Sequence, residues 1–187
     1  MKRAIAGILL LLLLCACQET LTATVTRFTT LPVPPGGQTF VVMAQGLQNG
    51  NLEFQHVAGL VSAALQAHGY QPVPPGDASK AGLVVLLQYG PAGSRSQVIE
   101  YGYGPGWYRW GFPPYDIYTL YSQFLEVDML DGPAWRRGEQ RMVFQGRAFT
   151  ESAVREFNVV VPYLVQALFE RFPGINGETI RVKIPVN

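Results

Sequence analysis

The chain has 187 residues, of which 48% are hydrophobic and 14% are charged. This composition is typical of a globular protein and excludes disorder as the main state. Its 14 basic and 13 acidic residues give a formal net charge of +1, so the chain lacks the excess positive charge with which proteins bind a nucleic-acid backbone.

Residues 1–16 have the layout of a cleaved signal peptide. Met1, Lys2 and Arg3 form a short positive start, and an apolar run follows from Ala4 to Ala16. A helix that spans a bilayer needs about 20 apolar residues, and this run is shorter. We therefore expect export of the chain rather than a retained transmembrane helix.

The apolar run ends in Leu14, Cys15, Ala16 and Cys17. This resembles the bacterial lipobox, which has a leucine three positions before the modified cysteine and a small residue directly before it. The resemblance implies that Cys17 becomes the mature N-terminus and carries a diacylglycerol and an acyl chain. An ordinary secretory signal with incidental cysteines is the alternative. Gln18 stands where an aspartate favours inner-membrane retention, so we expect a lipid anchor on the periplasmic face of the outer membrane.

Residues 17–37 are predicted to form a lipidated N-terminus that is either a tether or an edge strand. Within them, Leu21 to Thr30 is rich in threonine and valine, which favour strands. Prolines and glycines then force a turn. We expect residues 38–187 to form a single domain, because a chain of this length rarely divides into two.

The first half of this domain reads as strand, helix, strand. Thr39 to Met43 predicts a short buried strand. From Leu52 to His68, apolar residues recur at three- and four-residue steps, as in a helix, and Gly69 is suited to end it. Gly82 to Tyr89 is a continuous apolar run, which is typical of a central strand covered on both faces.

The second half predicts a hairpin followed by a helix and a strand. Tyr121 to Met129 and Gln140 to Thr150 alternate in polarity, as half-buried strands do. Ser152 to Phe172 has helical periodicity, and Pro162 within it predicts a kink or a late start. Thr179 to Ile184 reads as a last strand. The predicted class is α+β, with a mixed, mainly antiparallel sheet and two helices packed on one face.

Between the two halves, Ser96 to Tyr103 predicts a further strand, and an aromatic and glycine-rich stretch follows from Gly104 to Tyr118. Aromatic side chains with polar tips suit sugar stacking, partner binding or the boundary of a lipid headgroup layer. The alternative, which we favour, is a loop that folds across the sheet and fills its own core. If the stretch is a binding loop, its candidate residues are Tyr103, Trp107, Tyr108, Arg109 and Trp110.

We expect no catalytic residues: Glu126 and Asp128 would form a catalytic pair only in an alternative interpretation, and a solvated polar face is favoured. On one face of a strand they would stand about 7 Å apart, a separation found in glycoside hydrolases, although any half-solvated strand shows the same alternation. His56 and His68 are twelve residues apart and are predicted to lie on different faces of the helix. We therefore expect no metal site. No cofactor is expected either, because Gly102, Gly104 and Gly106 are interrupted by Pro105 and meet neither the dinucleotide nor the P-loop pattern.

Taken in order, several segments resemble the bacterial lipoprotein family called domain of unknown function 4136. The resemblance covers nearly the whole mature chain and implies an envelope location and an α+β fold, but no established chemistry. The matching segments are Gln38–Phe40, Leu65–Tyr70, Gly82–Tyr89, Tyr101–Gly104, Phe124–Asp131, Phe144–Arg147 and Leu168–Pro173.

The leading functional expectation is a lipid-anchored envelope lipoprotein that acts as a non-catalytic structural or binding module on the periplasmic side. Its expected partners are the membrane, through the anchor, and an envelope protein or glycan, but not nucleic acid. Two alternatives remain: a peptidoglycan or glycan hydrolase that uses Glu126 and Asp128, and a small-ligand carrier with a pocket between helices and sheet.

Overall fold

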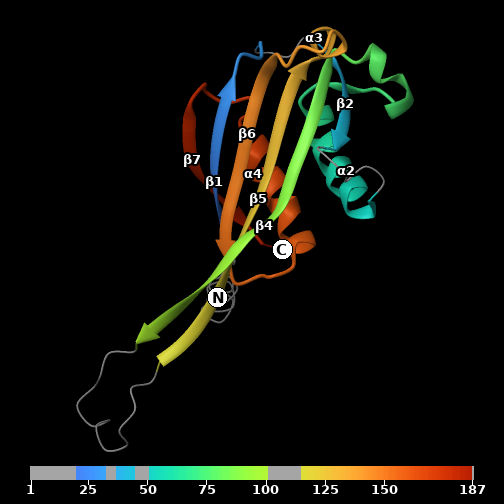
Figure 1. The fold of residues 1–187 in the computed structure, drawn as a ribbon. Helices are drawn as coiled ribbons and strands as arrows, with labels where there is room; N and C mark the ends of the chain where they lie inside the picture. The colour runs from blue at the N-terminus through green and yellow to red at the C-terminus, as the bar shows by residue number, and fades with distance from the viewer. Residues whose placement is uncertain (1–19, 33–36, 45–50, 101–114, 187) are drawn as a thin grey trace, which may run out of the picture.

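The computed structural model describes residues 20–32, 37–44, 51–100 and 115–186. These residues form one seven-stranded sheet in the order β3-β2-β4-β5-β6-β1-β7 (Figure 1). Its strands are β1 (Thr20–Thr29), β2 (Thr39–Ala44), β3 (Gln71–Pro72), β4 (Leu83–Glu100), β5 (Tyr115–Asp131), β6 (Met142–Ser152) and β7 (Glu178–Pro185).

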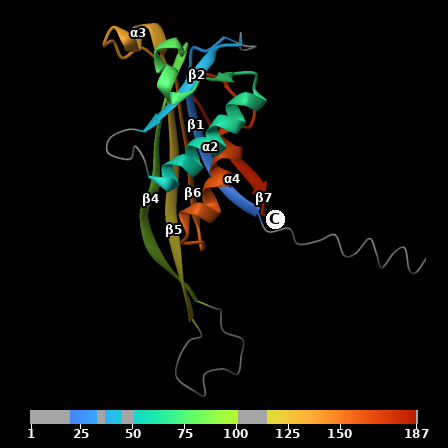
Figure 2. The ribbon, with the colours of Figure 1, turned by 90° about the vertical axis from the view of Figure 1, so that its right-hand side faces the viewer.

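The helices are α2 (Leu52–Ala67), α3 (Gly132–Arg136), α4 (Phe157–Phe169) and a 3₁₀ helix, η2 (Pro75–Lys80). Strand β2 runs parallel to β3 and β4, and the other neighbouring strands are antiparallel. Helices α2 and α4 lie on one face of the sheet (Figure 2). The predicted class is therefore confirmed, and α2 is the crossover that joins the parallel strands β2 and β4.

The main core lies between this face of the sheet and the two helices. Alternate residues of β5, among them Leu125 and Val127, point into it, because successive side chains in a strand lie on opposite faces. Val61 of α2 and Leu164 of α4 are fully buried against them. Asn51 caps the N-terminus of α2: its side chain accepts a hydrogen bond from the Glu53 amide.

Strand β1 corrects the prediction of a tether or edge strand within residues 17–37, and it extends the folded unit before residue 38. It lies between β6 and β7, with Leu21, Ala23 and Val25 buried beneath the helices. Thr20, Thr22, Thr24 and Thr26 alternate with these residues and face the other side. In an antiparallel sheet with one solvated face, an interior strand can carry this half-polar pattern as well as an edge strand can.

Strand β4 corrects the prediction of two separate strands, Gly82 to Tyr89 and Ser96 to Tyr103. It continues through Gly90, Pro91 and Gly93, where the pairing with β5 shifts register. Both glycines have positive φ, at 137° and 135°, and accommodate a bulge. In the sequence, Gly90, Pro91 and Gly93 suggest that a strand ends here. In the structure they mark an irregularity inside one long strand.

The second predicted helix is shorter than expected. Strand β6 extends to Ser152, so α4 begins only at Phe157. Pro162 lies inside the helix, five residues after its first residue, so the proline does not mark the start. The connection between β5 and β6 contains the short helix α3, which is capped by Asp131: the Oδ1 of this aspartate accepts a hydrogen bond from the Ala134 amide at 2.8 Å. A smaller cluster of Val41, Ala81 and Val84 lies on the face opposite α2 and α4.

Candidate functional site

Two groups of predicted site residues lie outside the described part of the chain. Cys17 falls within residues 1–19, and the candidate binding loop from Tyr103 to Trp110 falls within residues 101–114. Both predictions stay open. Among the described residues, no helix is long and apolar enough to span a membrane.

Glu126 and Asp128 lie on the face of β5 that points away from the helices, as their alternation predicts. Across the strands, Glu126 is paired with Arg147 of β6, and Asp128 is paired with Gln145. The Gln145 side chain donates a hydrogen bond from Nε2 to Glu126 Oε1 at 3.4 Å. The Arg147 guanidinium stacks over Phe124, with 5.0 Å from its Cζ to the ring centroid.

Asp128 is buried, with only 7% of its surface exposed, and its Oδ1 has no hydrogen-bond partner. Burial raises the pKa of Asp128, and the charge of Glu126 raises it further, while the hydrogen bond with Gln145 opposes the rise. A carboxyl group with a raised pKa is what a general acid requires. However, the depression of about 320 Å³ beside this pair is lined by Glu126, Gln145 and Arg147 but not by Asp128. Within the described structure, the two carboxylates are not presented to one shared cavity.

The histidines do not form a ligand pair. His56 is exposed, whereas His68 packs against the rings of Phe169 and Phe172, with centroid distances of 6.1 and 5.2 Å. His68 Nε2 lies 3.1 Å from the carbonyl oxygen of Phe169. Among the described residues, no group of three or more histidine, cysteine, aspartate or glutamate side chains could hold a metal ion.

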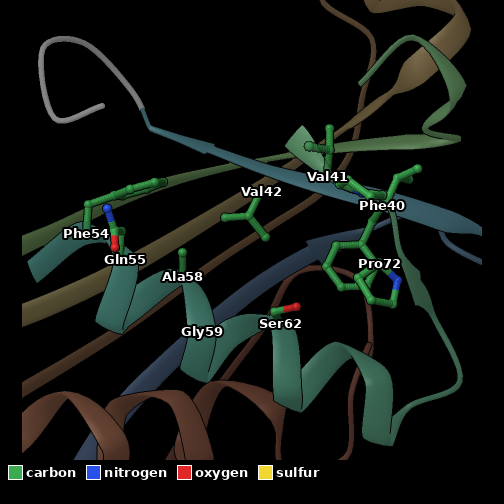
Figure 3. Close-up of a pocket in the computed structure, with 11 residues that line it drawn as sticks. Phe40, Val41, Val42, Phe54, Gln55, Ala58, Gly59, Ser62 and Pro72 are labelled. Carbon is green, nitrogen blue, oxygen red and sulfur yellow. The ribbon is translucent and has the colours of Figure 1, made fainter. Parts of the chain in front are cut away.

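A groove with a volume of about 500 Å³ lies between α2 and β2. Ligand sites usually occupy about 300–1,000 Å³ and are mainly apolar. Figure 3 shows Val42 of β2 and Ala58 of α2 pointing toward one another across the groove. Phe40, Val41, Phe54, Gln55, Gly59, Ser62, Pro72, Val73 and Pro74 complete its lining.

The helical wall of the groove is low because its side chains are small. Ala58, Gly59 and Ser62 occupy neighbouring positions on α2 at one-, three- and four-residue steps. A Cβ added to Gly59 would meet no atom within 4 Å. The wall therefore has open space above it, and Gln55 supplies an exposed polar group at its rim.

The strand wall of the groove also offers backbone hydrogen-bonding groups. The carbonyls of Gln38 and Phe40 accept bonds from the amides of Gln71 and Val73, at 3.1 and 2.7 Å. Strand β3 pairs with β2 no further than Phe40. Since backbone groups alternate in direction along a strand, those of Val42 point to the same side as those of Phe40. No described strand covers β2 at Val42 on this side.

An uncovered strand edge beside an apolar groove can bind an extended polypeptide. The edge supplies main-chain donors and acceptors, and the groove accepts the side chains of the added strand. The small-ligand alternative predicts a pocket between helices and sheet but does not name its residues. The small residues of α2 are visible in the sequence and could have indicated the groove. The early end of β3 depends on pairing between distant segments, so no local sequence pattern predicts it.

A family model described as "Domain of unknown function (DUF4136)" matches residues 26–174. No curated protein matches the chain. Among solved structures, the chain is similar to a DUF4136 family protein from Bacteroides thetaiotaomicron, with 14% identity and a TM-score of 0.45. That match covers 86% of this chain and 98% of the other.

Two further solved structures are similar at low identity. A PDZ domain protein from Parabacteroides distasonis has 10% identity and a TM-score of 0.49 over 89% of this chain, which spans only 39% of that protein's length. The PelC dodecamer from Paraburkholderia phytofirmans has 12% identity and a TM-score of 0.44, and the match covers 78% of this chain and 94% of that one.

Proposed function

Because this chain belongs to the family of domains of unknown function DUF4136, for which no activity is defined, we propose a function from its own features. We propose that it is an envelope lipoprotein, anchored to the periplasmic face of the outer membrane through Cys17, and that it acts as a non-catalytic binding module. The groove between α2 and β2 is its binding site, and the ligand is an extended polypeptide segment that adds to the edge of β2.

The proposed binding site is supported by two features that occur together at Val42. Its side chain lines an apolar groove of ligand size, and its backbone lies on a strand edge that β3 leaves uncovered. A small apolar ligand would use only the first feature. An extended peptide uses both, because it forms main-chain hydrogen bonds and buries alternate side chains.

The lipid anchor rests on the sequence at Leu14 to Cys17 and on its place at the end of the apolar run. A single acyl chain binds a membrane only marginally, whereas two or three chains hold it firmly, since each buried methylene contributes about 0.8 kcal/mol. Intact-mass measurement of the detergent-extracted protein tests the anchor. We expect Cys17→Ala to abolish the added lipid mass and outer-membrane recovery, and Cys15→Ala to leave both unchanged.

An unmodified mass for the parent protein, or recovery in the inner-membrane fraction, would contradict the proposed location. The matched pair of cysteine variants separates the lipid-bearing position from the thiol two residues before it, which the same cleavage would remove with the signal peptide.

The groove is tested by crosslinking in intact cells with a photoreactive amino acid placed at Gln55 or, as a control, at Ala63. Both positions are exposed on α2, but only Gln55 lines the groove. We expect protein adducts from Gln55 that disappear when Gly59→Leu fills the groove. Adducts of equal yield from both positions, or adducts insensitive to Gly59→Leu, would rule out this site.

A further inference from the structure

Strands β4 and β5 continue beyond the rest of the sheet as a two-stranded arm (Figure 1). We define the arm as residues 94–100 and 115–120. Strand β5 pairs with β6 only from Tyr121 onward, whereas its pairing with β4 extends to Tyr115 opposite Glu100. Residues 94–99 and 116–118 of the arm are exposed. The arm therefore has no neighbouring strand on either edge among the described residues.

The arm exposes apolar side chains on both of its faces. Val98 and Ile117 lie directly opposite one another, with 57% and 61% of their surfaces exposed. Ile99 and Tyr118, each 43% exposed, lie on the other face, since they follow these residues by one position. These four are among only nine large apolar residues exposed in the described structure. Such a clustering on a ribbon without a core indicates a surface that contacts something else.

The arm projects from the end of the body at which β1 begins, as Figures 1 and 2 both show. The register gives the same result: Ala23 pairs with Thr150 and Tyr121 with Ser152, so Thr20 lies close to the level of Tyr121. From Tyr121 to Tyr115 the arm extends roughly 20 Å. The three residue steps from Thr20 back to Cys17 span at most about 11 Å. A molecule that is anchored at Cys17, with its strands roughly perpendicular to the membrane plane, thus brings the arm to the bilayer.

We propose that the arm lies in the headgroup region of the same membrane that holds the lipid on Cys17, an inference that rests on the proposed anchor. A bilayer interface surrounds a ribbon and takes up both apolar faces, whereas a protein surface would cover one. Tyr118 has the amphipathic ring that is enriched at such interfaces. The proposal places the arm at the interface and not across the membrane, because no described strand covers its two edges and hydrocarbon cannot satisfy open backbone groups.

The test uses the full, acylated protein reconstituted in vesicles of phosphatidylethanolamine and phosphatidylglycerol. Once acylated and cleaved, the predicted mature chain has no other free cysteine, so Val98→Cys or Ile117→Cys carries a single environment-sensitive dye. Ile175→Cys is the matched control, because Ile175 is 70% exposed and lies just before β7, near the far end of β1 from the arm. Since these side chains are exposed, the substitutions leave the core unchanged.

We expect nitroxide-labelled lipid to quench the dye several-fold more strongly at positions 98 and 117 than at 175, and aqueous iodide to show the reverse order. Equal access of iodide to all three positions would overturn the inference while leaving the anchor intact. The intact mass of the same sample distinguishes the two failures. An unmodified mass would refute the proposed anchor, and the inference with it.

Discussion

At the scale of single residues, Arg27 is a buried cation that joins β1 to the end of α4. Its guanidinium donates hydrogen bonds to the carbonyls of Ala167, Leu168 and Glu170, at 3.0, 3.1 and 2.7 Å. Helix termini leave such carbonyls without partners and carry partial negative charge, so a cation is well placed here. Burial lowers the pKa of Arg27, and the carboxylate of Glu178, 3.8 Å away, opposes that change.

We expect Arg27→Met to lower the free energy of unfolding by about 3 kcal/mol or more, because it leaves several buried carbonyls unsatisfied at once. Glu178→Gln should cost about 1 kcal/mol or less, since that carboxylate is partly exposed and not within hydrogen-bond distance. Urea denaturation of the three proteins measures both. Similar losses in the two variants would mean that the ion pair, rather than the cap, carries the stabilisation.

The contribution of Asp128 to stability is expected to depend on pH. Its pKa is raised in the folded state, chiefly by burial, so the folded chain binds its proton more tightly than the unfolded chain does. The free energy of unfolding should therefore fall as the pH rises above the unfolded value of about 3.9, until the raised pKa has been passed.

Asp128→Asn should remove this fall and raise stability at neutral pH, by about 1 kcal/mol or more, since no buried charge remains. Asp77→Asn is the control, because Asp77 lies on η2 in an exposed pair with Lys80. Thermal denaturation between acidic and neutral pH compares the variants. A parent protein whose stability rises over the same interval relative to Asp128→Asn would contradict the sign.

At the scale of elements, helix α2 contains one glycine that its conformation does not require and is followed by one that it does. Gly59 lies inside the helix with open space around its missing side chain. Gly69 follows the C-cap residue His68 and has a φ of 88°, which other residues rarely adopt. The two glycines therefore differ in role. Gly69 ends the helix, whereas Gly59 leaves open space in the helical wall of the groove beside β2.

We expect Gly59→Ala to raise the free energy of unfolding by up to about 1 kcal/mol, because alanine favours the helix, and Gly69→Ala to lower it by about 1–2 kcal/mol. Equilibrium denaturation gives both values in one experiment. The two substitutions should change the free energy of unfolding in opposite directions. A lower free energy of unfolding in both variants would show that the space at Gly59 is occupied.

At the scale of the whole molecule, the arm is expected to be thermodynamically separate from the body. Its residues are largely exposed, and the main core is built from α2, α4 and the inner face of the sheet. The arm can therefore be altered without unfolding the body.

Replacing residues 97–118 by an Asn-Gly turn between Ser96 and Thr119, which are paired across the arm, should change the free energy of unfolding by less than about 1 kcal/mol. Calorimetry of the parent and shortened chains measures this difference. A large loss would indicate that the arm packs on the body.

The amino-acid sequence by itself determined the elements whose signal is local. Helix α2, the central strand beginning at Leu83, the β5–β6 hairpin and the family resemblance all follow from periodicity, turn residues and short motifs, and the structure and the family match bear them out. The lipid anchor is also a local motif, and it stays a prediction.

Only the tertiary structure decided what depends on pairing between distant segments. It placed β1 inside the sheet, carried β4 through its bulge into the arm, buried Arg27 under α4, and ended β3 so early that no described strand covers β2 at Val42. Strand neighbours and exposed edges arise from contacts between residues far apart in the chain, whereas polarity and propensity report only which face of an element is buried.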